Sequence, residues 1–253
     1  MTIDLTSQTI LVTGASRGIG AEIARQLHAA GAHVIVHYGQ SATAAEALQT
    51  ELGSRVTLLQ ASLERAEAAD ELFRAAVAVN GRIHTLVNNA GVSVNSGFDA
   101  PLATFVDDWD RTMNVNLRAS GVLCRAAVNH FRSDGDGGRI VNIASRAAFR
   151  GDTKDYVAYA ASKGGMVAMT RSIARAYGKD GIKAFTIAPG WVMTDMAKQF
   201  MDEGGEQTIL SELALPTLTQ PSDVAPTVVF LASGLSDHAT GCTIDINAGS
   251  YVH

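Results

Sequence analysis

Tyr159 and Lys163 are the residues of this sequence whose types and spacing point most directly to chemistry. They stand four residues apart in a stretch of helical period, so both side chains leave one face of a helix and reach one site. A phenol with a pKa of about 10 is a poor acid or base at neutral pH, but a neighbouring ammonium favours the phenolate. The pair is therefore a candidate acid or base tuned by its neighbour, with an ordinary amphipathic helix face as the alternative.

A second candidate is the run 13–20, which reads Thr-Gly-Ala-Ser-Arg-Gly-Ile-Gly. It follows a short apolar run and precedes a stretch of helical period. Three glycines there permit a tight turn, a close approach of the backbone to a pyrophosphate, and close packing of the helix on the strand. The N-terminus of the helix would face the phosphates. The run predicts a dinucleotide site, and taken alone it is also compatible with a merely tight turn.

The elements that position these residues alternate between two types. Short β-branched apolar runs alternate with longer helical stretches, which predicts parallel strands joined by crossover helices. The predicted strands are 9–13, 33–37, 56–60, 85–88, 139–144, 183–188 and 243–246, and the predicted helices are 19–30, 42–52, 66–80, 108–131, 154–178 and 222–231. Several strands are apolar almost throughout, as expected when helices cover both faces. The predicted fold is α/β, a Rossmann-type doubly wound seven-stranded parallel sheet with helices on both faces.

Composition narrows the class of protein further. The chain has 253 residues, 47% of them apolar and 18% charged, with a formal net charge of −5. This composition excludes disorder, and without a basic block we expect no nucleic acid as partner. No apolar run approaches the roughly 20 residues of a membrane helix, so we expect no membrane partner. Cys124 and Cys242 lack metal-like spacing, which favours a reducing, cytoplasmic location and no metal site. We expect one domain, 1–253, with a helical substrate lid over 194–216.

Further motifs accompany the first two and extend over nearly the entire chain. They are Asn88-Asn89-Ala90-Gly91 after the fourth predicted strand, Asn116 within Asn114-Val115-Asn116-Leu117, Ser145 at the end of the fifth strand, and Pro189-Gly190 followed by Thr194 after the sixth. Together with the glycine run and Tyr159-Ala160-Ala161-Ser162-Lys163, they resemble the short-chain dehydrogenase/reductase family in order and spacing. Within that family the chain looks most like the 3-oxoacyl carrier-protein reductases, because 13–20 and 189–196 read like theirs.

The resemblance implies a catalytic set of Asn116, Ser145, Tyr159 and Lys163. Tyr159 would exchange a proton with the substrate oxygen, and Ser145 would hydrogen-bond the same oxygen. Lys163 would hold the nicotinamide ribose, and Asn116 would break its helix locally and position a water in a proton relay. The implied cofactor-binding residues are Gly14, Ser16, Arg17, Gly18, Ile19, Gly20, His37, Tyr38, Ser62, Leu63, Asn89, Ala90, Gly91, Tyr159, Lys163, Pro189, Gly190, Val192 and Thr194. Asn88 and Asn89 have a second interpretation, as hydrogen bonds that tie the fourth strand to neighbouring backbone.

The choice of nicotinamide cofactor depends on charge. Sites for NAD place an Asp or Glu about 20 residues beyond the glycine turn, on the adenosine ribose. Here the second strand ends in His37-Tyr38-Gly39-Gln40-Ser41, and no acid follows until Glu46. By the resemblance Arg17 stands beside this ribose, where it can pair with a 2′-phosphate. The sequence favours NADP (NADPH), with NAD as the alternative and Arg17 then a solvated cation.

The pocket walls are expected from residues around the catalytic set, namely 92–94, 146–149, Tyr156, Trp191, Met193 and the lid from Met196. Most of these residues are apolar. Arg146 is the exception, and it either meets an acidic group or points to solvent.

Acidic residues at the helix ends bear on the substrate. By the resemblance, a carrier-protein reductase has basic residues at the ends of its two long helices, whereas this chain has Asp134, Asp136 and Asp180 there. Carboxylates repel an acidic partner. A small-molecule ketone or secondary alcohol is therefore as good a substrate as an acyl chain.

Three hypotheses follow: an NADP(H)-dependent carbonyl or 3-oxoacyl reductase, an NAD-dependent alcohol or sugar dehydrogenase, and a non-catalytic dinucleotide sensor. The family resemblance further implies a homotetramer, in which the helices starting near Asp108 and Lys154 form one interface and the last strand and helix form another.

Overall fold

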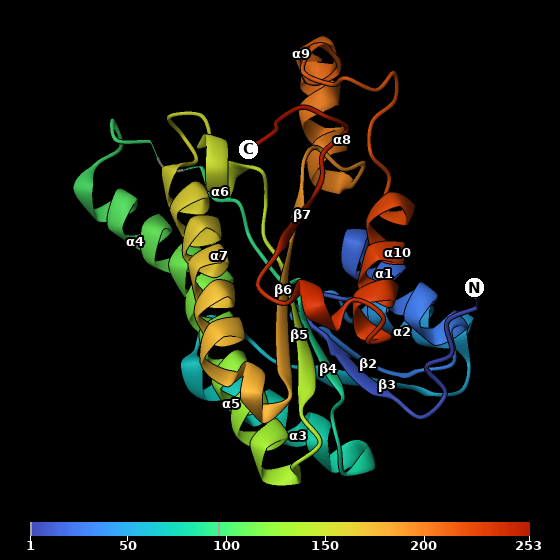
Figure 1. Cartoon of the computed structure of the whole chain (residues 1–253). Coiled ribbons are helices and arrows are strands. Elements are labelled where there is room, and N and C mark those ends of the chain that lie inside the picture. Colours follow the sequence, from blue (N-terminus) through green and yellow to red (C-terminus); the bar gives the residue numbers. More distant parts are fainter. Residues whose placement is uncertain (1, 96) are drawn as a thin grey trace.

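Seven parallel strands form the central sheet (Figure 1). They are β1 (Thr9–Val12), β2 (His33–Tyr38), β3 (Val56–Gln60), β4 (Thr85–Asn88), β5 (Gly138–Ile143), β6 (Ile182–Pro189) and β7 (Thr243–Ile246). Their order is β3-β2-β1-β4-β5-β6-β7, so the winding direction reverses between β1 and β4. The computed structural model describes residues 2–95 and 97–253, and at 196, 199, 200, 203 and 204 it describes the backbone alone. The predicted doubly wound sheet is confirmed.

Helices cover both faces of this sheet (Figure 1). One face carries α1 (Gly18–Ala29), α2 (Ala42–Leu52) and α10 (Pro221–Ala232), and the other carries α3 (Ala66–Asn80), α5 (Ala119–Asp134) and α7 (Val157–Tyr177). The strands are buried on both sides: Ile10 and Val12 pack toward α1 and α10, while Leu11 packs toward α3 and α5. Each buried aliphatic side chain contributes about 1.5–3 kcal/mol. This two-sided burial explains why the strand sequences are apolar throughout.

The region 102–134 differs from the prediction. The single predicted helix 108–131 is wrong, because the chain forms α4 (Leu102–Met113), a π-helical segment η1 (Asn114–Arg118) and then α5. The prediction missed the first turns of α4 because their apolar side chains do not face a core: Leu102 is 77% exposed and Val106 is 43% exposed.

The other predicted ends lie close to the observed ones. The predicted helix 154–178 begins later, at Val157, and the remaining ends fall within one residue of the prediction. The short helix α6 (Ala147–Arg150) was not predicted, since four residues are too few to show a period.

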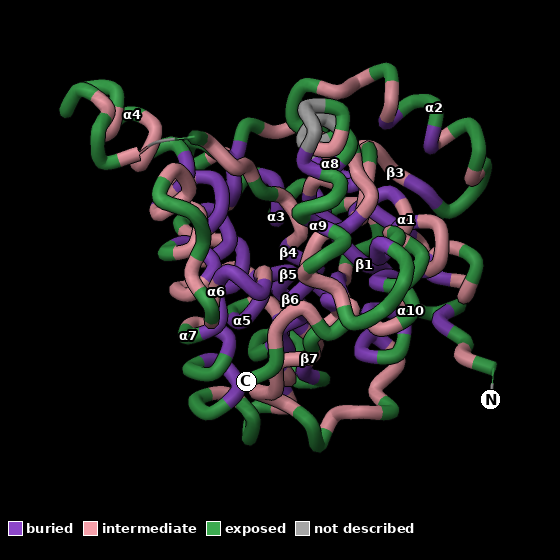
Figure 2. The backbone as a smooth tube through the Cα atoms, turned by 90° about the horizontal axis from the view of Figure 1, so that it is seen from above, coloured by how far each residue is buried: buried purple, intermediate pink, exposed green. Residues whose placement is uncertain are grey.

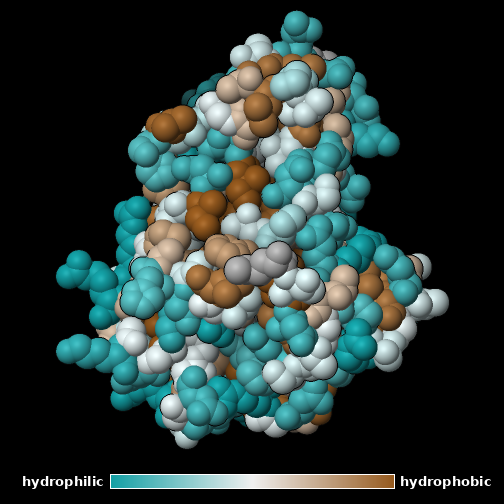
Figure 3. All heavy atoms as spheres, turned by 45° about the vertical axis from the view of Figure 1, so that its right-hand side comes forward, coloured by the Kyte–Doolittle hydropathy of each residue, from teal (hydrophilic) through white to brown (hydrophobic). Residues whose placement is uncertain are grey.

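The segment 194–216 contains no strand and forms α8 (Asp195–Phe200), a π-helical segment η3 (Met201–Gly205) and α9 (Glu206–Ser211). Figures 1 and 2 show it above the carboxyl edge of the sheet, and Figure 3 shows apolar side chains in a hollow beneath it. Its two ends meet in a β-bridge between Val192 and Thr219, where the Met193 N–H donates to the Thr219 carbonyl over 2.8 Å. The segment therefore enters and leaves the fold at one point.

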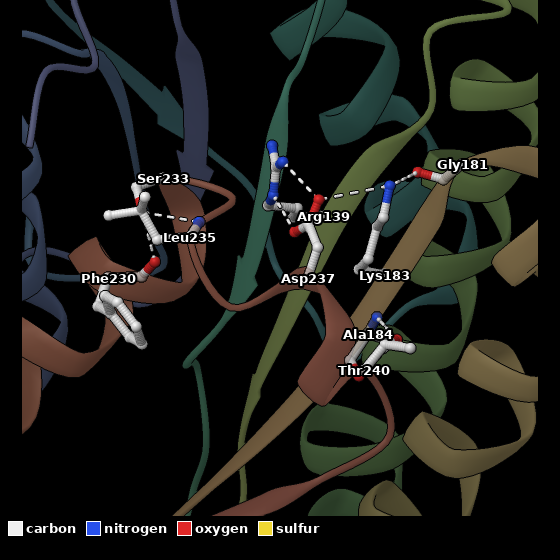
Figure 4. Close-up of polar contacts among 9 residues, drawn as sticks. All are labelled: Arg139, Gly181, Lys183, Ala184, Phe230, Ser233, Leu235, Asp237 and Thr240. Carbon is white, nitrogen blue, oxygen red and sulfur yellow. Dashed lines mark hydrogen bonds and ion pairs between the residues drawn. The ribbon is translucent and has the colours of Figure 1, made fainter.

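An ion-pair cluster lies where β5 and β6 begin, at the end of the strands opposite the carboxyl edge (Figure 4). Arg139 donates from Nε and Nη2 to both carboxylate oxygens of Asp237, each over 2.9 Å. Lys183 Nζ lies 3.4 Å from the same carboxylate. Burial alone would raise the pKa of Asp237, but the two cations outweigh it and hold that pKa below its usual value. Asp237 thus joins two strands to the turn before β7.

We expect Asp237→Asn to lower the free energy of unfolding at pH 7 by about 1–2 kcal/mol, measured by urea denaturation. Because the folded-state pKa is depressed, this stabilisation is present above the unfolded pKa of about 4 and is lost as pH falls below it. The difference between parent and variant should therefore shrink toward pH 2. Asp70→Asn, in the exposed pair with Arg74, is the control and should cost less than about 0.5 kcal/mol. An equal cost in both variants would contradict this account.

Candidate active site

The candidate catalytic side chains gather where β5 ends against α7. Ser145 follows β5, and Tyr159 and Lys163 lie on the first turns of α7. The Ser145 hydroxyl lies close enough to the Tyr159 phenol to lower its pKa. Lys163 Nζ lies 5.7 Å from the centre of the Tyr159 ring and donates to the Ile143 carbonyl over 2.8 Å. The structure thus brings together three residues that the sequence placed on two separate elements.

Burial dominates the acid–base properties of this group. It raises the pKa of Tyr159, with the Ser145 hydrogen bond acting in the opposite direction and the negative charge of Asp152 adding to the rise. Burial also lowers the pKa of Lys163 to about 8. The expected lowering of the tyrosine pKa by its lysine neighbour is not seen, since burial, Ser145 and Asp152 are the influences on that pKa. The phenol therefore keeps its proton at neutral pH and is suited to donating it.

Asn116 lies within η1 and, as the prediction has it, interrupts the regular helix. Its side chain holds the backbone of Val92 from both sides: Oδ1 accepts from the Val92 N–H over 2.8 Å, and Nδ2 donates to the Val92 carbonyl over 2.9 Å. Nδ2 also donates to Ser162 Oγ, beside Lys163. The observed role of this amide is to lock the chain after β4 onto α7.

The glycine turn is held by side chains from β4's exit. Asn89 Nδ2 donates to the carbonyls of Thr13 and Gly14, over 2.9 and 3.0 Å. Thr13 Oγ1 accepts the backbone N–H groups of Asn89 and Ala90. A Cβ on Gly20 would lie 2.3 Å from the Gly14 carbonyl oxygen, so no larger residue fits there without displacement. Thr13 therefore holds the glycine turn against the chain after β4. The predicted set omits it, although its place directly before the turn could have indicated this role.

The start of α1 is suited to an anion. Its N-cap, Arg17, makes no side-chain capping bond, and the first turn contains no acidic residue. The amide N–H groups of this turn therefore meet no capping carboxylate or hydroxyl from α1 itself. Gly14 and Gly18 have φ values of +61° and +56°, which L side chains rarely adopt, and the turn they form exposes backbone rather than side chain.

His37, one of the predicted cofactor-binding residues, contacts the glycine turn through its ring. Its ring is buried, with Nδ1 accepting the Gly14 N–H over 3.1 Å and Nε2 bonded to the Ala61 carbonyl over 3.1 Å. Burial lowers the pKa of His37 to about 4, so the ring is neutral at physiological pH. The ring braces the glycine turn from behind, and only its backbone remains at the edge of the predicted cofactor site.

The other predicted cofactor residues lie along the same carboxyl edge. Tyr38, Ser62, Gly91 and Ile19 are partly or fully exposed there, whereas Leu63 and Val192 are buried in the core. Gly190 donates its N–H to the Ile246 carbonyl, next to Pro189 at the end of β6. A Cβ on Gly18 would lie 3.2 Å from Thr194 Cγ2, so the glycine turn touches the start of the lid. The side chain of Met196, a predicted pocket wall, lies outside the described residues.

Two ion pairs join this edge to the lid. Arg17 Nη1 lies 3.6 Å from the Asp195 carboxylate of α8, with both side chains largely exposed. Arg146 Nη2 donates to Glu212, just after α9, over 2.5 Å, and Arg146 is only 5% exposed. The alternative of Arg146 pointing to solvent is therefore wrong, and the acidic group it meets is Glu212. Sequence reasoning found neither acid, since nothing local marks a partner so distant along the chain.

The acidic helix ends need a correction. Asp134 and Asp136 both pair with Arg82, and Asp180 pairs with Arg132. Since two arginines offset part of the charge of these three carboxylates, the predicted repulsion of an acidic partner by this surface is weaker than the sequence alone suggests.

The geometry agrees with comparisons with known proteins. The family model described as Enoyl-(Acyl carrier protein) reductase matches residues 14–251. The chain is 36% identical to a 3-oxoacyl-(acyl-carrier-protein) reductase of Synechocystis, covering 97% of each chain. It is 35% identical to 2-dehydro-3-deoxy-D-gluconate 5-dehydrogenase of Escherichia coli, covering 97% of this chain and 96% of that one.

A solved structure agrees as well. The crystal structure of a dehydrogenase/reductase from Sinorhizobium meliloti superposes with a TM-score of 0.90 at 34% identity, covering 99% of this chain and 98% of that one. With a family match over most of the chain and a shared fold, this chain belongs to the short-chain dehydrogenase/reductase family of NAD(P)-linked oxidoreductases that interconvert CH–OH and C=O.

Proposed function

We propose that this enzyme is an NADP(H)-dependent carbonyl reductase that transfers a hydride between the nicotinamide and a ketone or secondary alcohol. The observation that carries the proposal is the group formed by the partly exposed Tyr159 and Ser145 and the buried Lys163. It contains a protonated phenol and a hydroxyl that can both reach one substrate oxygen, beside a glycine turn fit for a pyrophosphate. A dinucleotide sensor would need the turn and not the phenol.

The residues present fit a dinucleotide. The uncapped first turn of α1 would receive the pyrophosphate, and Gly14 and Gly18 leave the backbone accessible there. Asn89, Thr13 and His37 hold that turn in shape through their hydrogen bonds. When bound, the nicotinamide supplies or accepts the hydride. Pro189, Gly190 and Thr194 line the approach from β6 to the lid.

In the reductive direction Tyr159 donates its phenolic proton to the carbonyl oxygen, while Ser145 hydrogen-bonds the same oxygen and stabilises the charge that develops on it. The raised pKa of Tyr159 keeps that proton available. Lys163, fixed by the Ile143 carbonyl, presents a positive charge beside the phenolate that forms, and that charge lowers the cost of proton loss. Asn116 supports this group by holding Val92 and Ser162 in place.

We expect Tyr159→Phe to lower kcat by about 10²–10⁴-fold, because it removes the proton donor and keeps the ring. The dissociation constant of NADPH, measured by fluorescence, should change by less than about 3-fold. Tyr177→Phe is the matched control at the far end of α7, where the ring contacts Arg132, and it should retain activity. Undiminished turnover in Tyr159→Phe would overturn the mechanism.

Charge around the adenosine end supports NADP. β2 ends at Tyr38, and the first acid beyond it is Glu46, within α2. Arg17 stands at the turn with an exposed guanidinium that can meet a 2′-phosphate. The observation that favours NAD, and with it an alcohol or sugar dehydrogenase, is the Asp195 carboxylate beside Arg17. The exposed pair of Arg17 with Asp195 is weak, and a 2′-phosphate carries more negative charge than one carboxylate. The phosphate should therefore displace Asp195 from Arg17, and we place NADP first.

We expect NADPH to bind more tightly than NADH, and Arg17→Gln to weaken NADPH by about 10-fold while changing NADH by less than about 3-fold. Titration of both cofactors by calorimetry measures this difference. Arg25→Gln, on the same helix but paired with Glu51, is the control and should change neither affinity. Tighter binding of NADH in the parent enzyme would favour the NAD-dependent alternative.

The substrate class proposed is a small ketone or its alcohol, with a 3-oxoacyl chain still compatible, since Arg82 and Arg132 offset part of the charge of the acidic helix ends. Among the described helices none is long and apolar enough to cross a membrane. Cys124 and Cys242 are free thiols, which supports the expected reducing, cytoplasmic location.

We further propose a homotetramer, supported by exposed apolar side chains at both expected interfaces. Phe98 and Leu102 are 72% and 77% exposed at α4, and Phe230 and Leu235 are exposed at the end of α10. Light scattering should give four chains for the parent and two for Leu102→Glu or Phe230→Glu. Leu210→Glu, an exposed apolar residue of the lid, should leave the mass at four chains. A monomeric parent would refute the assembly.

A further inference from the structure

Arg146 connects the catalytic strand to the lid. It directly follows Ser145, and its backbone N–H donates to the Pro189 carbonyl at the end of β6. Its side chain extends to Glu212, at the end of α9, over 2.5 Å. The guanidinium therefore spans the space between the proposed proton-transfer group and the segment that covers it.

The charges of Arg146, Arg150 and Glu212 do not balance. Arg150 Nη1 approaches the second oxygen of Glu212, at 3.5 Å, so two guanidinium groups share one carboxylate. Burial alone would raise the pKa of Glu212, but Arg146 and Arg150 outweigh it and hold that pKa below its usual value, so the carboxylate is ionised. One positive charge remains. Asp152, the acid that acts on Tyr159, is itself exposed and so offsets this charge only weakly.

Arg146 also has an unused donor. Its Nη1 is buried and has no hydrogen-bond partner among the described residues. A buried polar group without a partner destabilises the folded state, and a charged one does so more strongly. Folded proteins rarely keep such a donor unless a ligand or water uses it, and this one belongs to a residue adjacent to the proposed reaction centre.

We propose that Arg146 recognises a carboxylate on the substrate, so that the enzyme acts on oxo acids or hydroxy acids. The two terminal nitrogens of a guanidinium match the two oxygens of a carboxylate. In the structure Glu212 occupies part of that position, through its bond to Arg146 Nη2. Because Nη1 is shielded in this conformation, an incoming carboxylate reaches it by displacing Glu212, which makes Glu212 a competitor. This inference rests on the proposed reductase function.

The test compares oxo acids with their neutral esters. Oxo acids with the ketone at carbons 2 to 5, and the methyl ester of each, are assayed with NADPH by absorbance at a fixed pH of 7. The quantity measured is kcat/KM for the acid divided by kcat/KM for its ester. The parent enzyme should prefer the acid by about 10- to 100-fold at the chain length that reaches Arg146.

Two variants and a control decide the outcome. Arg146→Gln should lower the acid-to-ester ratio by at least about 10-fold, and Glu212→Gln, which keeps the shape and removes the competing charge, should raise it by about 3-fold or more. Arg150→Gln, the more exposed partner of Glu212, should change the ratio by less than about 3-fold. The proposal requires both changes. If the ratio stays constant in Arg146→Gln, or does not rise in Glu212→Gln, the ion pair of Arg146 with Glu212 only holds the lid in place and the proposal is wrong.

A second readout does not depend on turnover. Succinate, which has no carbonyl to reduce, should raise the melting temperature of the parent enzyme with NADP bound and should have no effect on Arg146→Gln. A parent that reduces esters but shows no preference for acids and no response to succinate would overturn the carboxylate site and leave the reductase standing. Absence of turnover with every ketone would instead count against the proposed function itself.

Discussion

The close approach of the chain leaving β1 to the chain leaving β4 is the constraint on which the site depends. A parallel sheet whose winding reverses between two neighbouring strands leaves a crevice at their carboxyl ends. Here one amide, that of Asn89, fills the top of this crevice by donating to two carbonyls of the other chain. Gly20 fits against the same groups because it has no Cβ. These contacts hold the glycine turn at the carboxyl edge of the sheet, where the first turn of α1 has no side-chain cap.

A second set of hydrogen bonds, between buried side chains, connects the sheet to α7. Asn88 donates to Asn142 over 2.8 Å, and Asn142 donates to Thr170 over 2.8 Å, joining β4, β5 and α7. Thr170 lies two turns beyond Lys163 on the same helix. Since buried amides are costly unless paired, this set favours a single placement of the helix on the sheet. The interpretation of Asn88 as a structural residue is therefore the one its contacts support.

Much of this arrangement follows from the sequence because it depends on local patterns. Strand runs, helix periods and glycine positions mark the sheet and the turn, and the spacing of Tyr159 and Lys163 places them on one helix face. The misjudged features are those set by contacts between distant segments. The contacts of the buried His37 ring with Gly14 and Ala61 could not be predicted, because both partners lie more than 20 residues away along the chain. The early start of α4 was missed because its exposed apolar side chains have no core to face within one chain.

The net charge follows from the composition, but the charge of each surface depends on which residues meet in the fold. A net charge of −5 describes no surface of the molecule, because carboxylates and guanidinium groups far apart in sequence meet in pairs. Asp134 and Asp136 share Arg82, so this surface carries less negative charge than its acidic residues suggest. At Arg146 and Arg150 the imbalance has the opposite sign, with one carboxylate for two cations. Since exposed pairs contribute little and a buried unmatched charge costs much, the imbalance has its largest effect beside Ser145, where a substrate can offset it.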